Sequence, residues 1–562
     1  MSKLLLNAKK NLREILLSAI GQAIAKNQLP EATIEDFLIE IPAQKTHGDF
    51  ATNIAMISAK SFKMSPIKIA KIISENIDLT ESEFEKFEVV SPGFINFFLK
   101  REFLFDVVLN ILNEKQNYGK SDFGKGQKVN IEFVSANPTG PMHMGNARGG
   151  ALGDCLASVM QEAGFDVTRE FYINDAGNQI DKFALSLDIR YQQIFKGEEN
   201  IELPEECYQG DDIKELALKF AQIHNDSYLF KDQKERQKAL VEFALPINIK
   251  KMHENLDKYR IYYDVWFKES KLHEENKVNE VIEKYKKLGL TYEKDGALFL
   301  KTKDEEKDEV LVRANGTPTY FAADIAYHVN KFNDRHFDRC IDIWGADHHG
   351  HVARLKAALQ ALGVNSKKLD IILMQLVRLK RDGQITKMSK RTGKALQLED
   401  LLNEVSTDSA RFIFNLREAN SQMDFDLSLA VKQDSQNPVY YVQYAHARIC
   451  SIIKNIKNAD EKIQNCSYED LKLLTKEEEI DLIKHLSTFT DEIINSAKNY
   501  DPAKITRYVI ELATLFHKFY NACKVNTNDE TLTKARLALC LATKITIKNI
   551  LDMFKISAPE SM

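Results

Sequence analysis

The sequence predicts a multidomain α/β protein, and three observations support this. The chain has 562 residues, which is too long for one hydrophobic core, so three or four domains are expected. From Lys128 onward, short β-branched stretches alternate with helix-like stretches, which indicates a doubly wound parallel sheet of the Rossmann type. After Leu416 the pattern is almost purely helical, which predicts an all-α bundle. The predicted units are a small α+β domain (1–108), the sheet domain (109–420, with an insertion at about 192–245) and the helical bundle (421–562).

Composition and charge are those of a soluble globular protein, with 44% apolar and 28% charged residues. No apolar run approaches bilayer length, and Leu5, Leu12 and Leu16 make the first helix amphipathic instead of a signal peptide. We therefore expect a cytoplasmic protein. The seven cysteines include no C-x-x-C pair, which disfavours disulfides and structural zinc. The net charge of −5 argues only weakly against a nucleic-acid partner, because the local distribution of charge decides.

The first unit of the predicted sheet carries a candidate phosphate site. Val129–Val134 predicts a strand, the proline- and glycine-containing stretch 135–142 must turn, and a helical pattern begins at Asn146. His143 and Gly145 therefore lie where a strand has ended and a helix begins, where free N–H groups and the positive helix end suit a phosphate. Gly145 allows close approach, and His143 can donate a hydrogen bond to a phosphoryl oxygen. An H-x-G at such a junction also occurs by chance.

The second unit is a strand at Val167–Ile173, followed by N-D-A-G-N-Q-I-D (174–181) and a helix. Ligands of a doubly wound sheet lie at the carboxyl ends of its strands, which makes Asn174 and Asp175 candidate ligands. The alternative is that one of them merely caps the next helix.

Further along, a strand ends before Asn315-Gly316 and a helix is predicted to start near Thr319. Tyr320 and Asp324 are four residues apart on that helix and share a face. A phenol and a carboxylate side by side can hold a planar guanidinium, the carboxylate by a bidentate pair. From the residues alone, an ordinary Tyr–Asp hydrogen bond is an equal alternative.

Cys340–Trp344 predicts another short strand, which ends in W-G-A-D-H-H-G-H (344–351). Three histidines and an aspartate in five positions suggest a metal. We expect none, because a catalytic zinc needs a fixed third ligand.

A second motif, T-K-M-S-K-R-T-G, occupies 386–393, between a predicted strand at Ile371–Leu379 with a hairpin turn and a predicted helix at Leu398–Val405. A solvated charged face is the usual explanation of such a run. Met388 and Ser389 within the motif, and its position between two elements, argue against that explanation. The basic residues around it, answered only by Asp382, are Arg378, Lys380, Arg381, Lys387, Lys390, Arg391 and Lys394.

Together, H-M-G-N (143–146) and K-M-S-K (387–390) resemble the two signature motifs of class I aminoacyl-tRNA synthetases, H-I-G-H and K-M-S-K-S. Asn146 stands where that motif has its second histidine. The resemblance extends over essentially the whole chain and is to arginyl-tRNA synthetases in particular. The stretches that carry it are 45–56 and 91–99 (their N-terminal domain, which touches the outer corner of the tRNA), Y-I-N-D-A-G-N-Q-I (172–180), T-Y-x-x-x-D (319–324) and I-S-A-P-E-S-M (556–562).

This resemblance implies ATP-dependent attachment of L-arginine to its cognate tRNA through an arginyl-adenylate, with ATP accompanied by Mg²⁺, no structural metal and no membrane, by a monomer. The implied catalytic residues are His143, Asn146, Lys387 and Lys390. The implied ATP-binding residues are Pro138, Thr139, Gly140, Pro141, Met142, His143, Met144, Gly145, Asn146, His348, Lys387, Met388, Ser389 and Lys390. The implied arginine-binding residues are Glu132, Ser135, Ala136, Asn137, Asn174, Asp175, Tyr320, Asp324 and Asp347. The implied tRNA-binding residues are Tyr440, Tyr444, His446 and Met562.

Two other functions stay open. A nucleotidyltransferase of the same superfamily that uses no tRNA would leave the helical C-terminal domain unexplained. A non-catalytic tRNA-binding paralogue is suggested only by Asn146, and the intact K-M-S-K speaks against it. Within 439–449 some of the aromatic residues are expected to be helix core, with only one or two facing RNA.

Overall fold

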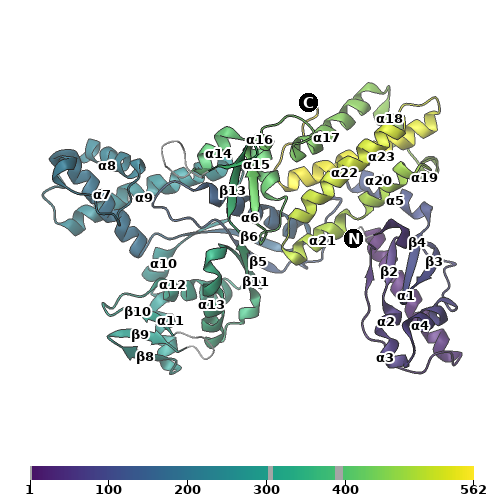
Figure 1. The fold of residues 1–562 in the computed structure, drawn as a ribbon, viewed down its shortest axis with the longest axis horizontal. Coiled ribbons are helices and arrows are strands. Elements are labelled where there is room, and N and C mark those ends of the chain that lie inside the picture. The colour runs from purple at the N-terminus through teal and green to yellow at the C-terminus, as the bar shows by residue number, and fades with distance from the viewer. Residues whose placement is uncertain (1–2, 43, 302–307, 387–395) are drawn as a thin grey trace.

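The computed structural model describes residues 3–42, 44–301, 308–386 and 396–562 (Figure 1). A central parallel sheet carries a projecting helical insertion on one side and a long helical bundle on the other, and the small N-terminal domain lies beside the bundle (Figure 1). The predicted fold class, a multidomain α/β protein with a helical C-terminal part, is confirmed.

The N-terminal domain combines helices with a four-stranded antiparallel sheet of order β1-β2-β4-β3. Leu5, Leu12 and Leu16 are buried at helical spacing in the same core as the sheet. Phe97 packs edge-on against Phe84, with ring centroids 5.7 Å apart. The elements are α1 (Lys3–Ala25), β1 (Ile39–Glu40), β2 (Phe50–Thr52), α2 (Ile54–Ile57), α3 (Ala59–Phe62), α4 (Pro66–Ser74), β3 (Phe84–Val90) and β4 (Phe94–Leu99).

Helix α5 (Arg101–Glu114) leads out of this domain and packs against α20 (Glu477–Ser487) and α23 (Glu530–Met553) of the C-terminal bundle. Just beyond it, the Tyr118 hydroxyl donates a hydrogen bond to the Leu486 carbonyl at 2.6 Å. The domain boundary expected at residue 108 falls inside α5, so this helix is itself the connection between the domains.

The central sheet has five parallel strands in the order β12-β11-β5-β6-β7. Strand β5 starts the series, and the chain builds outward from it first on one side and then on the other. The strand order therefore reverses between β5 and β11, and ligands of such sheets bind at the carboxyl ends there. Helix α6, which follows β5, is buried on nearly every side. The bounds are β5 (Lys128–Glu132), α6 (Met144–Glu162), β6 (Asp166–Ile173), β7 (Val265–Lys268), β11 (Arg339–Gly345) and β12 (Leu369–Met374).

The stretch 371–379, predicted as one strand, is two strands. Strand β12 ends at Met374 in the central sheet, and β13 belongs to a second sheet of order β14-β13-β15. Because β15 pairs with β13, the chain beyond the boundary expected at residue 420 still belongs to this sheet. The bounds are β13 (Val377–Arg381), β14 (Gln384–Thr386), α14 (Leu398–Glu404), α15 (Thr407–Phe414), β15 (Met423–Asp426) and α16 (Leu427–Ala430).

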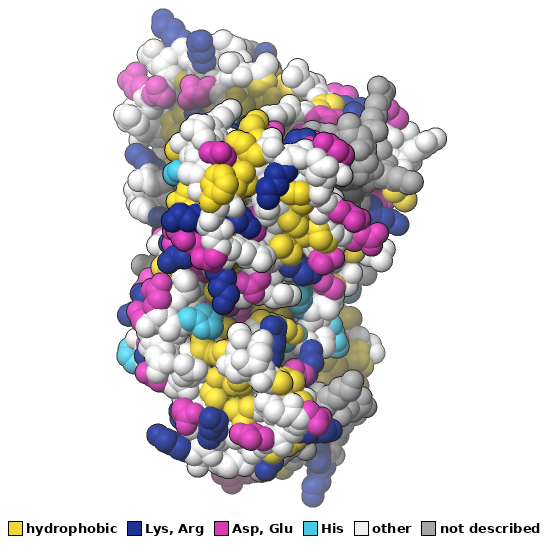
Figure 2. All heavy atoms as spheres, turned by 90° about the vertical axis from the view of Figure 1, so that its left-hand side faces the viewer, with side chains coloured by type: hydrophobic (Ala, Val, Ile, Leu, Met, Phe, Trp, Pro, Cys, Tyr) yellow, Lys and Arg dark blue, Asp and Glu magenta, His cyan; other side chains and the backbone are white. Residues whose placement is uncertain are grey.

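The insertion consists of α7 (Asn178–Lys196), α8 (Asp211–His224) and α9 (Gln233–Lys258), which share a core of their own. The insertion was expected to start at residue 192, which falls inside α7. Since the first half of α7 already faces this core, the insertion begins at the start of α7. Within it, Arg236 Nη2 donates to buried Asp188 Oδ2 at 3.1 Å. Seen from the insertion side, exposed apolar side chains are interleaved with charged ones (Figure 2).

A small antiparallel sheet, β8-β9-β10, and helices α10 to α13 form a second core below the central sheet in Figure 1. A π-helical turn at Asn330–Asp334 follows α12 directly. The bounds are α10 (Glu269–Glu274), α11 (Lys277–Lys287), β8 (Thr291–Lys294), β9 (Ala297–Leu300), β10 (Glu309–Val312), α12 (Tyr320–Val329) and α13 (His349–Ala361).

The C-terminal bundle completes the chain. Its helices are amphipathic or buried and pack around α22 and α23. Within the described ranges, no helix is both long and apolar enough to cross a membrane. The bounds not yet given are α17 (Pro438–Asn455), α18 (Ala459–Gln464), α19 (Tyr468–Leu471), α21 (Phe489–Asn499) and α22 (Ala503–Ala522).

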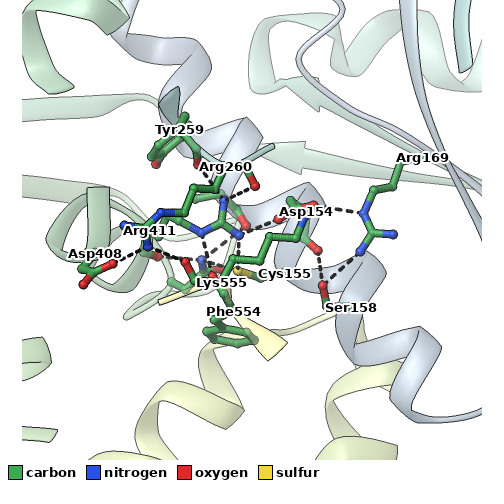
Figure 3. A network of polar contacts seen from close by, with 12 residues as sticks. Asp154, Cys155, Ser158, Arg169, Tyr259, Arg260, Asp408, Arg411, Phe554 and Lys555 are labelled. Carbon is green, nitrogen blue, oxygen red and sulfur yellow. Dashed lines mark hydrogen bonds and ion pairs between the residues drawn. The ribbon is translucent and has the colours of Figure 1, made fainter. Parts of the chain in front are cut away.

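A cluster of ion pairs joins the bundle to the central sheet (Figure 3). Asp154, fully buried on α6, accepts hydrogen bonds from Arg169 of β6 at 3.0 Å, from Lys555 at 2.7 Å and from Arg411 of α15. Arg411 also donates to the Phe554 carbonyl at 2.7 Å. Burial alone would raise the pKa of Asp154, but the positive charges of Arg411, Lys555 and Arg169 outweigh it and lower that pKa. One carboxylate thus holds three parts of the chain together.

We predict that Asp154→Asn lowers the free energy of unfolding by about 3–5 kcal/mol, because it leaves buried Arg411 without its counter-charge. Urea titration followed by tryptophan fluorescence measures this, since both tryptophans, Trp266 and Trp344, lie in the central sheet. Lys548→Ala, which removes an exposed ion pair on α23, is the control and should cost less than about 1 kcal/mol.

The loss of unfolding free energy in Asp154→Asn should also depend on pH. Because the folded-state pKa of Asp154 is lowered, its stabilisation is fully present above the unfolded carboxyl pKa of about 4 and is lost as the pH falls through the folded value. The stability difference between the parent chain and Asp154→Asn should be constant from about pH 6 to 7 and shrink below about pH 4. A difference that persists unchanged at low pH contradicts the assignment.

Candidate functional site

The chain turns sharply where β5 ends, at the point where the strand order reverses. Val134 and Ser135 have φ angles of +70° and +40°, an unfavourable region for a β-branched residue and one that is often found at functional sites. The Ser135 hydroxyl holds this turn, donating to Glu132 Oε1 at 2.9 Å and accepting the Tyr172 N–H at 3.1 Å. The turn places the Glu132 carboxylate at the carboxyl end of the sheet.

His143 is the N-cap of α6. Its Nδ1 accepts the Gly145 N–H at 3.0 Å, and Asn146 Oδ1 accepts the His143 N–H at 2.9 Å, which completes a capping box. A neutral ring that accepts at Nδ1 carries its proton on Nε2. His143 is exposed, so Nε2–H can donate to a ligand at the positive end of a long helix. The Asn146 side chain, held through its oxygen, keeps its N–H₂ group as a donor.

The backbone beside His143 pairs with the chain that follows the second motif. Met144 N–H donates to the Leu396 carbonyl, and Leu398 N–H donates to the Met142 carbonyl, both at 2.9 Å. The start of α6 and the described chain from Leu396 onward are therefore neighbours in the fold, although they lie about 250 positions apart in the sequence. The predicted residues Lys387, Met388, Ser389 and Lys390 themselves lie outside the described residues.

The remaining residues of the predicted ATP loop are placed unequally. Met142 and Met144 have buried side chains, so only their backbone can face a ligand. The loop is braced by the insertion: Asn248 donates to the Pro138 carbonyl at 3.0 Å, and the Thr139 hydroxyl lies 3.2 Å from that of Tyr208. Of the others, Gly140 and Gly145 are half-buried, and Pro141 and His348 are exposed.

Asp324 on α12 faces two histidines. Its Oδ2 lies 2.6 Å from His351 Nε2, and its Oδ1 lies 3.1 Å from His328 Nδ1. Burial alone would raise the pKa of Asp324, but the charges and hydrogen bonds of His328 and His351 lower it well below its usual range. Tyr320, one turn earlier, is 66% exposed. The predicted Tyr320–Asp324 face exists, and imidazoles instead of the phenol are the hydrogen-bond partners of the carboxylate.

A row of alternating charges continues inward from Asp324. His328 Nε2 lies 2.8 Å from Asp342 Oδ2, and Lys331 Nζ donates to Asp342 Oδ1 at 2.9 Å and to Glu132 Oε2 at 2.7 Å. All four inner side chains are at most 10% exposed. We name this row, Asp324–His328–Asp342–Lys331–Glu132, the charge row. Of these four buried residues only Glu132 was predicted from the sequence; His328, Asp342 and Lys331 were not.

A second acidic cluster lies at the ends of β6 and β7. Tyr172 donates to Glu269 Oε2 at 2.8 Å, and Asn174, with its amide nitrogen turned toward the same oxygen, donates to it at 3.1 Å. Asp175 accepts both the N–H and the hydroxyl of Ser270 at 2.8 Å. Asp175 therefore fixes the first turn of α10, not of the next helix α7, and its carboxylate is occupied by that contact. Glu269 was not predicted, although it follows strand β7 as Glu132 ends β5.

Three carboxylates influence one hydroxyl. Burial, and then the negative charges of Glu269, Asp324 and Glu132, raise the pKa of Tyr172 well above its usual value. We name these three acids together with Tyr172 the acidic pocket. Such a group of acids suits a ligand that carries more than one positive group, as an amino acid with a cationic side chain does. Asp347 has an 80% exposed side chain that pairs with His348 at 3.6 Å, so the structure does not bring it into this group.

The other predicted residues of this site are Ala136, which is half-buried, and Asn137, which is exposed. In the described parts of the chain, no group of three or more histidine, cysteine or acidic residues is arranged to hold a metal ion. The histidine-rich loop instead supplies His351 to Asp324.

A separate groove of about 760 Å³ lies in the bundle between α17, α22 and the C-terminal tail. Arg448 lies over the rings of Tyr444 and Tyr520, 4.9 Å from each centroid, and Met562 lines the groove. Tyr440 is half-buried beside Tyr444. His446 is 1% exposed and lies 2.8 Å from the Pro559 carbonyl, so it holds the tail, and its RNA contact stays a prediction.

Comparison with known proteins agrees with these features. The family described as "tRNA synthetases class I (R), catalytic domain" matches residues 107–453, "DALR anticodon binding domain" matches 442–562 and "Arginyl tRNA synthetase N terminal domain" matches 11–99. A protein of Acetivibrio thermocellus named arginine–tRNA ligase is 51% identical, and one of Caldanaerobacter subterraneus with the same name is 52% identical, each over 100% of both chains.

Solved structures give the same result. A structure from Campylobacter jejuni described as a putative arginyl tRNA synthetase is 33% identical, with a TM-score of 0.74 over 83% of this chain and 100% of that one. The Thermus thermophilus arginyl-tRNA synthetase has the same fold, with a TM-score of 0.74 at 21% identity over 98% of this chain and 100% of that one. Since the catalytic-domain family covers more than half of the chain, the chain belongs to the class I arginyl-tRNA synthetase family.

Proposed function

We propose that this chain attaches L-arginine to its cognate tRNA with ATP, through an arginyl-adenylate, releasing AMP and pyrophosphate. One observation carries the proposal: direct contacts join three carboxylates beside the carboxyl ends of the strands. Glu132 is joined to Asp324 through the charge row and to Glu269 through Ser135 and Tyr172, and the phosphate turn at His143 follows the same strand as Glu132. A pocket for a doubly cationic amino acid thus adjoins a site for phosphate.

In the first step an oxygen of the arginine carboxylate attacks the α-phosphate of ATP. A new O–P bond forms, the bond to the bridging oxygen breaks, and pyrophosphate leaves with its electron pair. His143 Nε2–H and the backbone amides at the start of α6 stabilise the charge that develops on the α-phosphate. Lys387 and Lys390 neutralise the leaving phosphates, a role supported by the pairing of Leu396 with Met144. Mg²⁺ accompanies the ATP and adds positive charge at those phosphates.

In the second step a hydroxyl of the terminal adenosine of the tRNA, the 2′-hydroxyl by analogy with class I, attacks the carbonyl carbon of the adenylate. An ester bond forms, the bond between the carbonyl carbon and the phosphate oxygen breaks, AMP leaves with that electron pair, and the hydroxyl proton is released. Positioning and charge stabilisation supply most of the catalysis, since the protein forms no covalent bond. Tyr320 and Asp324 hold the guanidinium, and Glu132, Asn174 and Glu269 complete the acidic pocket.

The tRNA is held at two further places. We assign the groove of Tyr444, Arg448 and Tyr520 to unpaired anticodon bases, because stacked aromatic rings and a guanidinium plane suit them. The N-terminal domain (1–108) touches the outer corner of the tRNA. We further propose that the enzyme works in the cytoplasm and is a monomer. Light scattering of the purified chain tests the oligomeric state.

ATP–pyrophosphate exchange is the decisive assay. We expect exchange that depends on arginine and on tRNA, and transfer of labelled arginine to tRNA. Exchange without arginine would instead identify a nucleotidyltransferase of another specificity. Binding of tRNA with no exchange would identify a non-catalytic tRNA-binding protein.

Asn146→Ala should lower kcat for exchange by about 100-fold or more, because it removes a donor from the nucleotide site. Since Asn146 also caps α6, thermal unfolding of the variant is measured in parallel. Asn146→Ser keeps a short polar group at this position and should lose less activity. A loss of no more than about tenfold in a folded Asn146→Ala variant would remove this residue from the catalytic set.

Tyr444→Ala should raise KM for tRNA by about tenfold or more, since one stacked base contributes about 1–3 kcal/mol. KM for arginine and ATP, measured at saturating tRNA, should not change. Tyr468→Ala, in the same bundle but against Phe105, is the control. Equal effects of both substitutions on KM for tRNA would contradict the groove assignment.

A further inference from the structure

Four side chains form a stripe along α12 and the turn after it. Tyr320, Asp324, His328 and Lys331 are spaced by four, four and three residues, so they share one face. Their side chains run from the surface to the interior: Tyr320 is 66% exposed, the Asp324 side chain is 22% exposed, and His328 and Lys331 are 1% and 0% exposed. Lys331 lies in the π-helical turn 330–334, a feature often found at functional sites.

His328 and Lys331 cannot touch a substrate, because they are buried beneath the residues that can. Every polar atom of the His328 ring faces an acceptor: Nδ1 faces the carbonyl and Oδ1 of Asp324, and Nε2 faces Oδ2 of Asp342. Both nitrogens therefore donate, which makes His328 an imidazolium between two carboxylates. Lys331 repeats the arrangement between Asp342 and Glu132.

We propose that His328 and Lys331 are positioning residues for arginine recognition: His328 fixes the orientation and negative charge of the Asp324 carboxylate, and Lys331 fixes the orientation of the Glu132 carboxylate. Asp342, between them, holds both cations in place. This inference rests on the proposed function and adds residues that act on the substrate only through others.

Stability does not account for the charge row. Buried ion pairs are often no more stabilising than apolar residues of the same volume, because each charge must lose its hydration. Five such groups in one row are instead explained by the role of the two carboxylates at its ends, Asp324 and Glu132, in binding the substrate. A bidentate pair needs a carboxylate that is ionised and held in one plane.

The test is His328→Gln in the full chain, assayed by aminoacylation and by exchange at saturating tRNA. We expect KM for arginine to rise by about 10- to 100-fold, as for loss of a charged hydrogen bond. KM for ATP and for tRNA should stay within about twofold, because neither ligand is bound by the charge row. The preference in kcat/KM for arginine over citrulline, its neutral counterpart, should fall, since the carboxylate loses fixed charge and orientation.

Arg236→Gln is the matched control, because it also leaves a buried carboxylate, Asp188, without its cation, but in the insertion. It should lower thermal stability and leave KM for arginine and the preference over citrulline unchanged. If His328→Gln does not fold, Asp342→Asn keeps the Asp324–His328 contact while removing the inner negative charge, and it should raise KM for arginine in the same selective way.

The inference is overturned if folded His328→Gln or Asp342→Asn has an ordinary KM for arginine, or if KM for arginine, ATP and tRNA all rise together. Failure of the proposed function looks different, since the unsubstituted chain would then show no arginine-dependent exchange at all. Arginine-dependent exchange in that chain, with unchanged arginine recognition in both variants, refutes the positioning role alone.

Discussion

A carboxylate that is buried well enough to bind a guanidinium without competition from water is also one that burial tends to protonate. The acidic pocket depends on how this conflict is resolved. At Glu132 burial wins and raises the pKa, although Lys331 opposes it. At Asp324 the two histidines win and lower the pKa. Because the signs of neighbouring charges alternate, Asp324 stays ionised. Asp324 is therefore a stronger partner for a guanidinium than Glu132 is.

Helix α6 connects this pocket to the rest of the molecule. Its first residues form the phosphate turn at His143, and its middle carries Asp154, which ties the helix to β6, to α15 and to Lys555. The chain after Lys555 is the tail that lines the groove of the bundle. A single buried helix therefore has the proposed nucleotide site at its end and the bundle fixed at its side, so this site and the groove of the bundle have a defined separation in the folded protein.

Local patterns in the sequence predicted what local physics determines. The end of β6 at Ile173 and the helix start near Thr319 follow from hydrophobic periodicity and turn residues. The same signals found β5 and α6, but β5 ends two residues before the expected Val134 and α6 starts two residues before the expected Asn146. The strand break at Met374 and the helical start of the insertion were not predicted, because both depend on contacts with residues that are distant in the chain. Lys331 was missed for the same reason, since its two acids come from β5 and β11. Its signal was a polar stripe on a helix that is otherwise apolar.

In the proposed arginine site, the orientation of the Asp324 carboxylate matters as much as its charge for distinguishing arginine from lysine. An ammonium group is a point charge that can approach a freely rotating carboxylate from many directions, whereas a guanidinium needs both oxygens in its own plane. His328 Nδ1 contacts one oxygen of Asp324, and His351 Nε2 contacts the other. A carboxylate held in this way offers a guanidinium its preferred geometry without cost, while lysine gains nothing from the fixed plane. Selectivity therefore comes from rigidity that is built one layer beneath the contact surface.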